Sequence, residues 1–243
     1  MDDDEYIDAD ARVAAGEGAP SQRVPLSRER IVSTAVAYIE QDGLPALTMR
    51  RLGERLGVEA MSLYRYVPSR EDLLDAVVEH ILEEMQADPD VIEEPQDGWQ
   101  DFLQRLAHGV RRVALAHPKA FPLVASRPLE APWLRPPLRS LEWVERFLVA
   151  LQREGFSDPD AVGAYRAFTS FLLGHLLLEV AAHGADVGPL DVLEDDDRPS
   201  RLDGFPTLAR LRGPLSEDHA AVEFEESLED LLQRLTLIRN AGM

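Results

Sequence analysis

Between Glu59 and Arg70 the chain carries several side chains that suit contact with nucleic acid. The guanidinium of Arg65 offers two parallel donors that match the edge of guanine, whereas tyrosine hydroxyls and Arg70 suit phosphate oxygens. Small and apolar side chains beside them can touch thymine methyl groups. The candidate set is Ala60, Met61, Ser62, Tyr64, Arg65, Tyr66 and Arg70.

The residues around this set predict two short helices joined by a tight turn, which is the frame that such contacts need. Thr48 is a favourable N-cap, and Leu52 and Leu56 fall on one face of the first helix. Gly57 stands where a helix C-terminus adopts a left-handed conformation. Pro68 ends the second helix, because proline disfavours helical geometry in the residue before it. Two short helices joined in this way form a helix-turn-helix, whose second helix enters the major groove of DNA.

The flanking segments supply one further helix on each side. Ser27 begins the preceding helix as its cap. Ser69 begins the following helix, with Asp72 in a weaker version of the capping box. That following helix is broadly apolar, so it is suited to join a DNA-binding domain to a second domain. We therefore assign residues 25–70 to a helix-turn-helix DNA-binding domain and residues 70–86 to a connecting helix.

Four stretches of this region follow one another in a characteristic order and spacing: Leu47–Leu52, Leu56–Val58, Ser62–Tyr66 and Arg70–Leu74. Through them the segment from Leu26 to about Met85 resembles the DNA-binding region of the tetracycline-repressor (TetR) family of bacterial regulators. The resemblance implies that the positions named above contact DNA, and it adds Arg50 to them.

Charge is distributed unevenly along the 243 residues. The formal net charge is −20, with −5 on residues 1–24, +2 on residues 25–70 and −17 on residues 71–243. A cationic segment inside an acidic chain fits a small DNA-contacting face on a body that DNA repels. The first 24 residues combine low hydrophobicity with excess acid, which predicts a disordered acidic tail.

The composition also sets the expected compartment. The chain has no cysteine, which excludes disulfides and thiolate metal sites. Its N-terminus is acidic rather than basic and then apolar, so we expect no signal peptide. The longest apolar run, Phe171–Ala182, is too short to cross a bilayer. We therefore expect a soluble cytoplasmic protein with no membrane partner.

After a proline-containing acidic connection at 88–98, every strong pattern in residues 87–243 is helical. Residues 184–204 have no periodicity and predict a mobile acidic loop. The expected architecture is all-α, with an N-terminal three-helix helix-turn-helix domain and a larger helical ligand-binding and dimerisation domain. The expected helices of the second domain run from Trp99 to Pro118, from about Leu138 to Gly155, from Asp158 to about His183 and from about Asp218 to Arg239.

Trp99–Leu103 and Ser126–Pro128 resemble the ligand-binding half of the same family, which implies a small-molecule effector. The aromatic content fits an apolar ligand cavity, and it fits a plain helical core equally well. The tetracycline-binding members carry a magnesium-binding histidine where this chain has Leu123 and a drug-binding asparagine where it has Leu106, so magnesium–tetracycline is not the expected ligand. The candidate pocket residues are Gln86, Leu103, Leu106, Val110, Leu123, Trp143, Phe147, Phe168, Phe171 and His175.

Two other kinds of chemistry have little support. His175 and Glu179 lie four residues apart on one helix face, but two ligands do not make a metal site and no further ligand pair has suitable spacing. No phosphate-binding loop, nucleophile elbow or catalytic carboxylate pair is recognisable. We expect no metal, no cofactor and no enzymatic activity.

The resemblance implies a homodimer, in which the helices at 158–183 and 218–239 pair with their mates in a four-helix bundle. The last helix carries more apolar surface than one neighbouring helix requires, so its leucines are the expected interface. Charge substitutions at Leu231 and Leu235 are expected to give monomers that lose operator binding. The candidate interface residues are Leu228, Leu231, Leu232 and Leu235.

The sequence thus predicts a ligand-responsive transcriptional regulator, more specifically a repressor released from a pseudo-palindromic operator by a small, largely apolar molecule. The alternatives are a transcriptional activator and a helical protein-interaction module whose DNA-binding domain is inactive. An enzyme is a distant third possibility.

Overall fold

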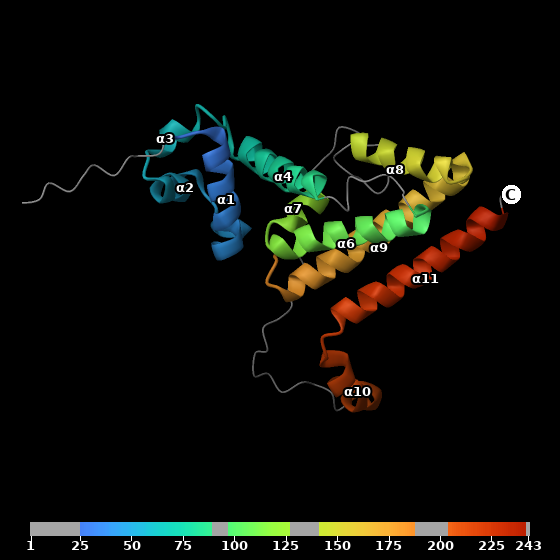
Figure 1. The fold of residues 1–243 in the computed structure, drawn as a ribbon. Helices are drawn as coiled ribbons and strands as arrows, with labels where there is room; N and C mark the ends of the chain where they lie inside the picture. Colours follow the sequence, from blue (N-terminus) through green and yellow to red (C-terminus); the bar gives the residue numbers. More distant parts are fainter. Residues whose placement is uncertain (1–24, 89–96, 127–140, 188–203, 242–243) are drawn as a thin grey trace, which may run out of the picture.

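The computed structural model describes residues 25–88, 97–126, 141–187 and 204–241, and every regular element within these ranges is a helix (Figure 1). The all-α prediction is therefore confirmed. The predicted tail at 1–24, most of the predicted connection at 88–98 and most of the predicted loop at 184–204 lie outside the described residues.

The DNA-binding domain contains α1 (Arg28–Asp42), α2 (Met49–Leu56) and α3 (Ala60–Leu63), with the short 3₁₀ helix η1 (Leu44–Ala46) between the first two. The predicted caps form, since Ser27 Oγ accepts from the backbone N–H of Arg30 and Thr48 Oγ1 from that of Arg51. Satisfying these otherwise unpaired N–H groups fixes where each helix starts. The three helices close on a shared apolar core made by Ile31, Ala35, Ile39, Leu47, Leu52, Leu56, Leu63 and Val67.

The second helix of the helix-turn-helix is only four residues long. After Leu63 the chain continues as a hydrogen-bonded turn, in which the N–H groups of Tyr66 and Val67 both donate to the Leu63 carbonyl. Val67 is buried, and Pro68 follows in a bend. The turn keeps Tyr64, Arg65 and Tyr66 next to α3.

The connecting helix α4 (Arg70–Ala87) belongs to both halves of the molecule. It packs on α1 in the DNA-binding domain and on α6 (Trp99–Ala116) and α7 (Phe121–Ser126) in the second domain (Figure 1). Seven of its side chains are buried, which agrees with its broadly apolar sequence. The buried residues of the two domains therefore form one continuous hydrophobic cluster.

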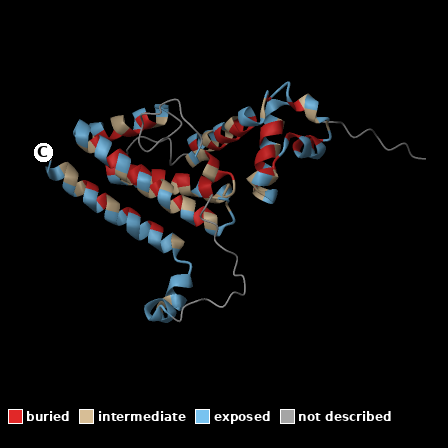
Figure 2. Cartoon of the chain, turned by 180° about the vertical axis from the view of Figure 1, so that it is seen from behind, coloured by how far each residue is buried: buried red, intermediate tan, exposed pale blue. Residues whose placement is uncertain are grey.

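The second domain is built around α9 (Asp158–Ala182), which contacts α6, α7, α8 (Leu141–Arg153) and α11 (Ala220–Ala241). By length and composition alone α9 also resembles a membrane span, the one such helix among the described residues. Its contacts with four helices identify it instead as the core helix of a bundle. Two helices were not predicted: α7 and α10 (Pro206–Ser216). Figure 2 shows α10 without a buried residue.

The leucines that were predicted to form a dimer interface lie mainly inside the single chain. Leu228, Leu232 and Leu235 are buried within the single chain, with exposed fractions of 5% or less, and Leu231 is partly buried. They fill the contact that α11 makes along α9 of the same chain. Leu228, Leu232 and Leu235 are therefore covered by their own chain. Periodicity marks an apolar face without saying which helix covers it, and a dimer interface at these leucines stays a prediction.

Candidate DNA interface and ligand cavity

Two glycines set the geometry of the helix-turn-helix. Gly57 has φ of 71°, the left-handed conformation predicted for the end of α2. Gly53 lies inside α2 and is buried. A Cβ atom at Gly53 would come within 2.9 Å of the Val58 carbonyl oxygen and 3.2 Å of the Ala60 nitrogen. The absence of a side chain at Gly53 thus permits α3 to approach α2 closely.

The predicted DNA-contacting residues gather on one small surface at α3, the turn after it and the start of α4. Met61 projects from α3 with 76% of its surface exposed, and Tyr64 and Tyr66 are 39% and 40% exposed. Arg65 and Arg70 are exposed, while the smaller Ala60 and Ser62 are half-buried between them. Leu63, by contrast, faces the core with no exposed surface. The inward and outward sides of this segment are thus clearly separated.

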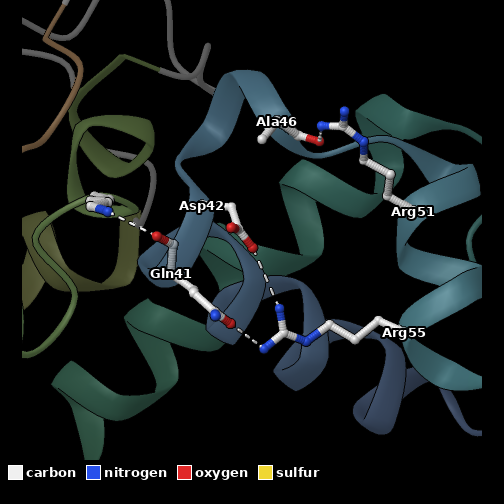
Figure 3. Close-up of polar contacts among 6 residues, drawn as sticks. Gln41, Asp42, Ala46, Arg51 and Arg55 are labelled. Atoms are coloured by element: carbon white, nitrogen blue, oxygen red, sulfur yellow. Dashed lines mark hydrogen bonds and ion pairs between the residues drawn. The ribbon is translucent and has the colours of Figure 1, made fainter.

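The five arginines on α2, after α3 and at the start of α4 divide into two groups. Arg51 donates to the Ala46 carbonyl, and Arg55 reaches from α2 to the side chains of Gln41 and Asp42 at the end of α1 (Figure 3). The Arg55 guanidinium also lies 5.3 Å from the centre of the Tyr38 ring. These two arginines therefore hold the domain together.

The second group faces solvent. Arg50 is paired with Glu54 one turn further along α2, at 3.0 Å, but 86% of its side chain is exposed. Arg65 makes no ion pair or side-chain hydrogen bond with the part of the chain that the structure describes. Arg70 stands at the N-terminus of α4, where the helix dipole favours an anion. Arg50, Arg65 and Arg70, the last with Glu71 at 3.8 Å, are therefore the arginines of the predicted DNA-contacting set, and all three are exposed.

The second domain contains an apolar cavity of about 60 Å³. Four of the ten predicted pocket residues line it: Gln86, Val110, Trp143 and Phe168. Among the described residues, the complete lining comes from five helices, α4, α6, α7, α8 and α9. The lining residues that sequence reasoning missed are Leu82, Met85, Phe121, Val124, Thr169, Leu172 and Leu173.

The other six predicted pocket residues do not line this cavity. Leu103, Leu106, Leu123 and Phe147 are buried in the surrounding core. Phe171 and His175 lie on the far side of α9, where both rings pack against Phe224 of α11. Helical periodicity placed these side chains on apolar faces but did not distinguish core from cavity wall.

The described cavity lining has no ionisable residue, but it is not entirely apolar. Thr169 is 3% exposed, and its hydroxyl makes no hydrogen bond of normal geometry. Tyr165, one turn earlier on α9, is also buried, and burial raises the pKa of its hydroxyl to about 12. A contact with the Thr169 hydroxyl offsets part of that rise, although it falls outside hydrogen-bond geometry. The raised pKa therefore makes the Tyr165 hydroxyl harder to ionise than that of an exposed tyrosine.

Comparison with known proteins matches both halves of the chain. A profile described as "Bacterial regulatory proteins, tetR family" matches residues 31–77, and one described as "Tetracyclin repressor-like, C-terminal domain" matches residues 92–236. The chain belongs to the tetracycline-repressor (TetR) family.

Individual relatives support the assignment along most of the chain. An HTH-type transcriptional regulator of Saccharopolyspora erythraea is 30% identical over 213 residues, which cover 83% of this chain and 86% of that protein. The crystal structure of a possible TetR family regulator from Streptomyces coelicolor A3(2) is 30% identical with a TM-score of 0.68, covering 87% of this chain and 100% of that one. The TetR family protein ActR from Streptomyces coelicolor, in complex with actinorhodin, is 26% identical with a TM-score of 0.62, covering 88% and 98%.

These relatives are transcriptional regulators rather than enzymes. The present chain is accordingly a TetR-family transcriptional regulator, with an N-terminal helix-turn-helix domain and a helical ligand-binding domain. The sequence-based assignment of family and function is confirmed.

In this TetR-family regulator the cavity wall is bonded directly to the DNA-binding domain. The backbone N–H groups of Lys119 and Ala120, immediately before α7, donate to the Glu40 carboxylate of α1 at 3.2 and 2.9 Å. The Lys119 ammonium also donates to the Gln41 carbonyl at 3.1 Å. Phe121 follows at once and lines the cavity, so these three bonds connect the cavity wall to the end of α1.

The histidine–carboxylate pair considered from the sequence has other partners in the regulator. Glu179 is almost fully buried and forms a two-point ion pair with Arg111 of α6. Hydrogen bonding to Glu179 raises the pKa of Arg111, against the lowering effect of burial. His175 instead contacts the Ala220 carbonyl at 3.2 Å. These contacts join α6 and α9 to α11 and give the pair a structural role.

Proposed function

We propose that this TetR-family regulator is a cytoplasmic repressor that binds a pseudo-palindromic operator as a homodimer and is released by a small, largely apolar effector. The observation that carries the proposal is the course of α4. This helix begins at Arg70 on the DNA-facing surface, and near its other end Leu82 and Met85 form a wall of the cavity. An effector in the cavity therefore touches the element that carries part of the DNA surface. The relative in complex with actinorhodin supports a small-molecule effector.

On DNA, the exposed groups divide into base and phosphate contacts. Arg65 reads a guanine, and Met61 and Ala60 touch thymine methyl groups from the start of the short helix. Tyr64, Tyr66 and Arg70 hold phosphates on either side. Ser62 and Arg50 complete the surface. Base contacts give sequence preference, whereas phosphate contacts give affinity for any sequence.

Two arginine substitutions test this division. Arg65→Ala should cost about 1–3 kcal/mol and relax the preference at one position of each half-site. Arg70→Ala should weaken binding to all sequences alike and reduce the salt dependence, because one phosphate contact per subunit is lost. The measurement is fluorescence anisotropy with operator variants at several salt concentrations. Uniform weakening of every operator variant by Arg65→Ala would exclude base reading by that residue.

The proposed dimer uses the outward faces of α9 and α11. These faces carry large apolar side chains without cover in the single chain, with Leu178 of α9 63% exposed and Leu237 of α11 72% exposed. A Cβ atom added at Gly163 or Gly174 of α9 would meet no atom within 4 Å, so a second helix can approach there. The combined substitutions Leu178→Glu and Leu237→Glu should give monomers by analytical ultracentrifugation. Dimers that persist at micromolar concentration would place the interface elsewhere.

Release from DNA follows from the size of the cavity. Its volume of about 60 Å³ is well below the roughly 300–1,000 Å³ of typical small-molecule sites. A drug-sized effector therefore has to displace the walls, which include α4 and α7. Recognition helices of a dimer have to lie about 34 Å apart, or a multiple of this, to enter successive major grooves. A shift of α4 that changes this spacing lowers operator affinity without unfolding either domain.

A further inference from the structure

One polar atom of the cavity has no partner of normal hydrogen-bond geometry among the described residues, since its contact with the Tyr165 side chain falls outside that geometry. Thr169 is 97% buried, it lines the cavity, and its Oγ1 makes no hydrogen bond of normal geometry. Such atoms are rare in folded proteins, because leaving a buried hydroxyl unpaired forfeits the hydrogen bonds that it made with water. Within the described residues only one other buried side-chain atom, Nδ1 of His117, shares this condition, and it does not belong to the cavity lining.

A bound water is a poor partner for this hydroxyl. An ordered buried water makes about three hydrogen bonds to polar groups. The described lining around Thr169 is aliphatic and aromatic, and the other polar lining residue, Gln86, is exposed to solvent. A water beside Thr169 would therefore leave most of its own hydrogen bonds unmade. A ligand that is apolar elsewhere and carries one oxygen satisfies the hydroxyl without that loss.

We propose that Thr169 is the anchoring and specificity-determining residue of the cavity, and that the effector is an uncharged ring compound with a carbonyl or hydroxyl oxygen directed at Thr169. The absence of charge follows from the lining, since no described lining residue is ionisable and a buried unpaired charge is costly. The ring follows from Phe121, Trp143 and Phe168, which offer aromatic faces and edges. This inference rests on the proposed effector function and specifies the chemistry of its ligand.

A matched pair of small probes tests the anchor. Acetophenone and α-methylstyrene have nearly the same shape, but the first carries a carbonyl oxygen where the second carries a CH₂ group. Their dissociation constants are measured by ligand-detected NMR for the wild-type protein, Thr169→Val, Thr169→Ser and Ser170→Ala. Ser170 is the next residue of α9 and is exposed, so it controls for removal of a nearby hydroxyl. Benzoate serves as the charged probe.

The expected result is a change between variants in the relative affinity for the two probes. An absolute preference for acetophenone is not expected, because α-methylstyrene gains affinity from its greater hydrophobicity. In Thr169→Val the dissociation constant of acetophenone divided by that of α-methylstyrene should rise about 3- to 10-fold, which is the equivalent of one ordinary hydrogen bond. Thr169→Ser and Ser170→Ala should keep the wild-type ratio, and benzoate should bind more weakly than either uncharged probe. Without probe, the melting temperature of Thr169→Val should be unchanged or higher, since valine replaces a hydroxyl that makes no hydrogen bond.

Three results would overturn the inference. If the ratio is the same in wild type and Thr169→Val, Thr169 does not anchor the ligand, although the cavity remains a binding site and the proposed function stands. A lower melting temperature of Thr169→Val would show that the hydroxyl is already bonded in the folded chain. If neither uncharged probe binds the wild-type protein, both the anchor and the effector cavity are refuted.

Discussion

The close approach of α2 and α3 can be tested by adding one methyl group. In Gly53→Ala the new Cβ would lie 2.9 Å from the Val58 carbonyl oxygen and 3.2 Å from the Ala60 nitrogen. One neighbour is a backbone atom of the turn before α3 and the other a backbone atom of its first residue, so no flexible side chain can move aside. The strain has to be relieved by displacing α3 from α2, which moves the DNA-contacting residues relative to the rest of the domain.

The expected effect on folding is small and the effect on DNA binding is large. Alanine favours a helix over glycine by about 1 kcal/mol, which offsets part of the roughly 1–3 kcal/mol that overpacking costs. The net loss in the free energy of unfolding should be about 0–2 kcal/mol. On DNA, a displaced α3 loses one good base contact per half-site, worth about 1–3 kcal/mol each. Operator affinity should therefore fall at least about 10-fold.

The neighbouring glycine provides the control. Gly57 has positive φ, and its added Cβ would meet no atom within 4 Å. Gly57→Ala should therefore cost about 1 kcal/mol of stability through backbone strain while leaving α3 in place. Urea denaturation gives the stabilities and fluorescence anisotropy gives the operator affinities. If Gly53→Ala binds operator as tightly as wild type, or if both variants lose the same operator affinity, the proposed geometry of α2 and α3 is refuted.

Three further substitutions probe the second domain and its link to the first. The raised pKa of Tyr165 means that between about pH 10 and 12 the folded chain keeps a proton that the unfolded chain releases. About 2 kcal/mol of the free energy of unfolding, present below pH 10, should therefore be lost as the pH rises through 12. Urea denaturation of Tyr165→Phe should not show this loss. Glu40→Gln should lower the free energy of unfolding by about 1–2 kcal/mol and speed amide exchange at the first turn of α7, whereas Glu83→Gln on α4 should do neither. The reason is that the glutamine side chain has one acceptor oxygen, so one of the two backbone N–H bonds is lost and the other is no longer charge-assisted. Glu179→Gln should cost about 2–3 kcal/mol in the same unfolding assay by leaving Arg111 without its buried partner, and a change below 0.5 kcal/mol would contradict that role.

Local sequence signals predicted the DNA-binding domain well. Thr48 and Ser69 cap the helices that they were expected to begin, and Gly57 adopts the expected left-handed conformation. These features depend on residues only a few positions apart, so the local sequence is enough to predict them. The division of arginines between structure and solvent was not predictable in the same way. Arg55 finds its partners more than ten residues away, at the end of α1.

The second domain was harder to predict because its features depend on distant residues. The helix α7 has six residues, and the N–H groups before it are bonded by Glu40, which lies about 80 residues earlier. In α10, Pro214 and the lack of any buried residue left no amphipathic pattern to recognise. The leucines of α11 showed a correct apolar face, but only the fold shows that α9 of the same chain covers it. The cavity likewise forms where five helices meet, and the spacing of residues along any one helix does not predict that meeting.

The central claim is that the apolar cavity and the DNA surface are thermodynamically linked. The most direct test measures the affinity of one cavity-binding ligand for the free protein and for the protein saturated with operator. Linkage requires that operator binding weaken ligand binding by the same factor by which the ligand weakens operator binding, typically about 5- to 150-fold. We predict equal factors in this range from the two titrations. Identical ligand affinities for free and operator-bound protein would show that the cavity does not control DNA binding.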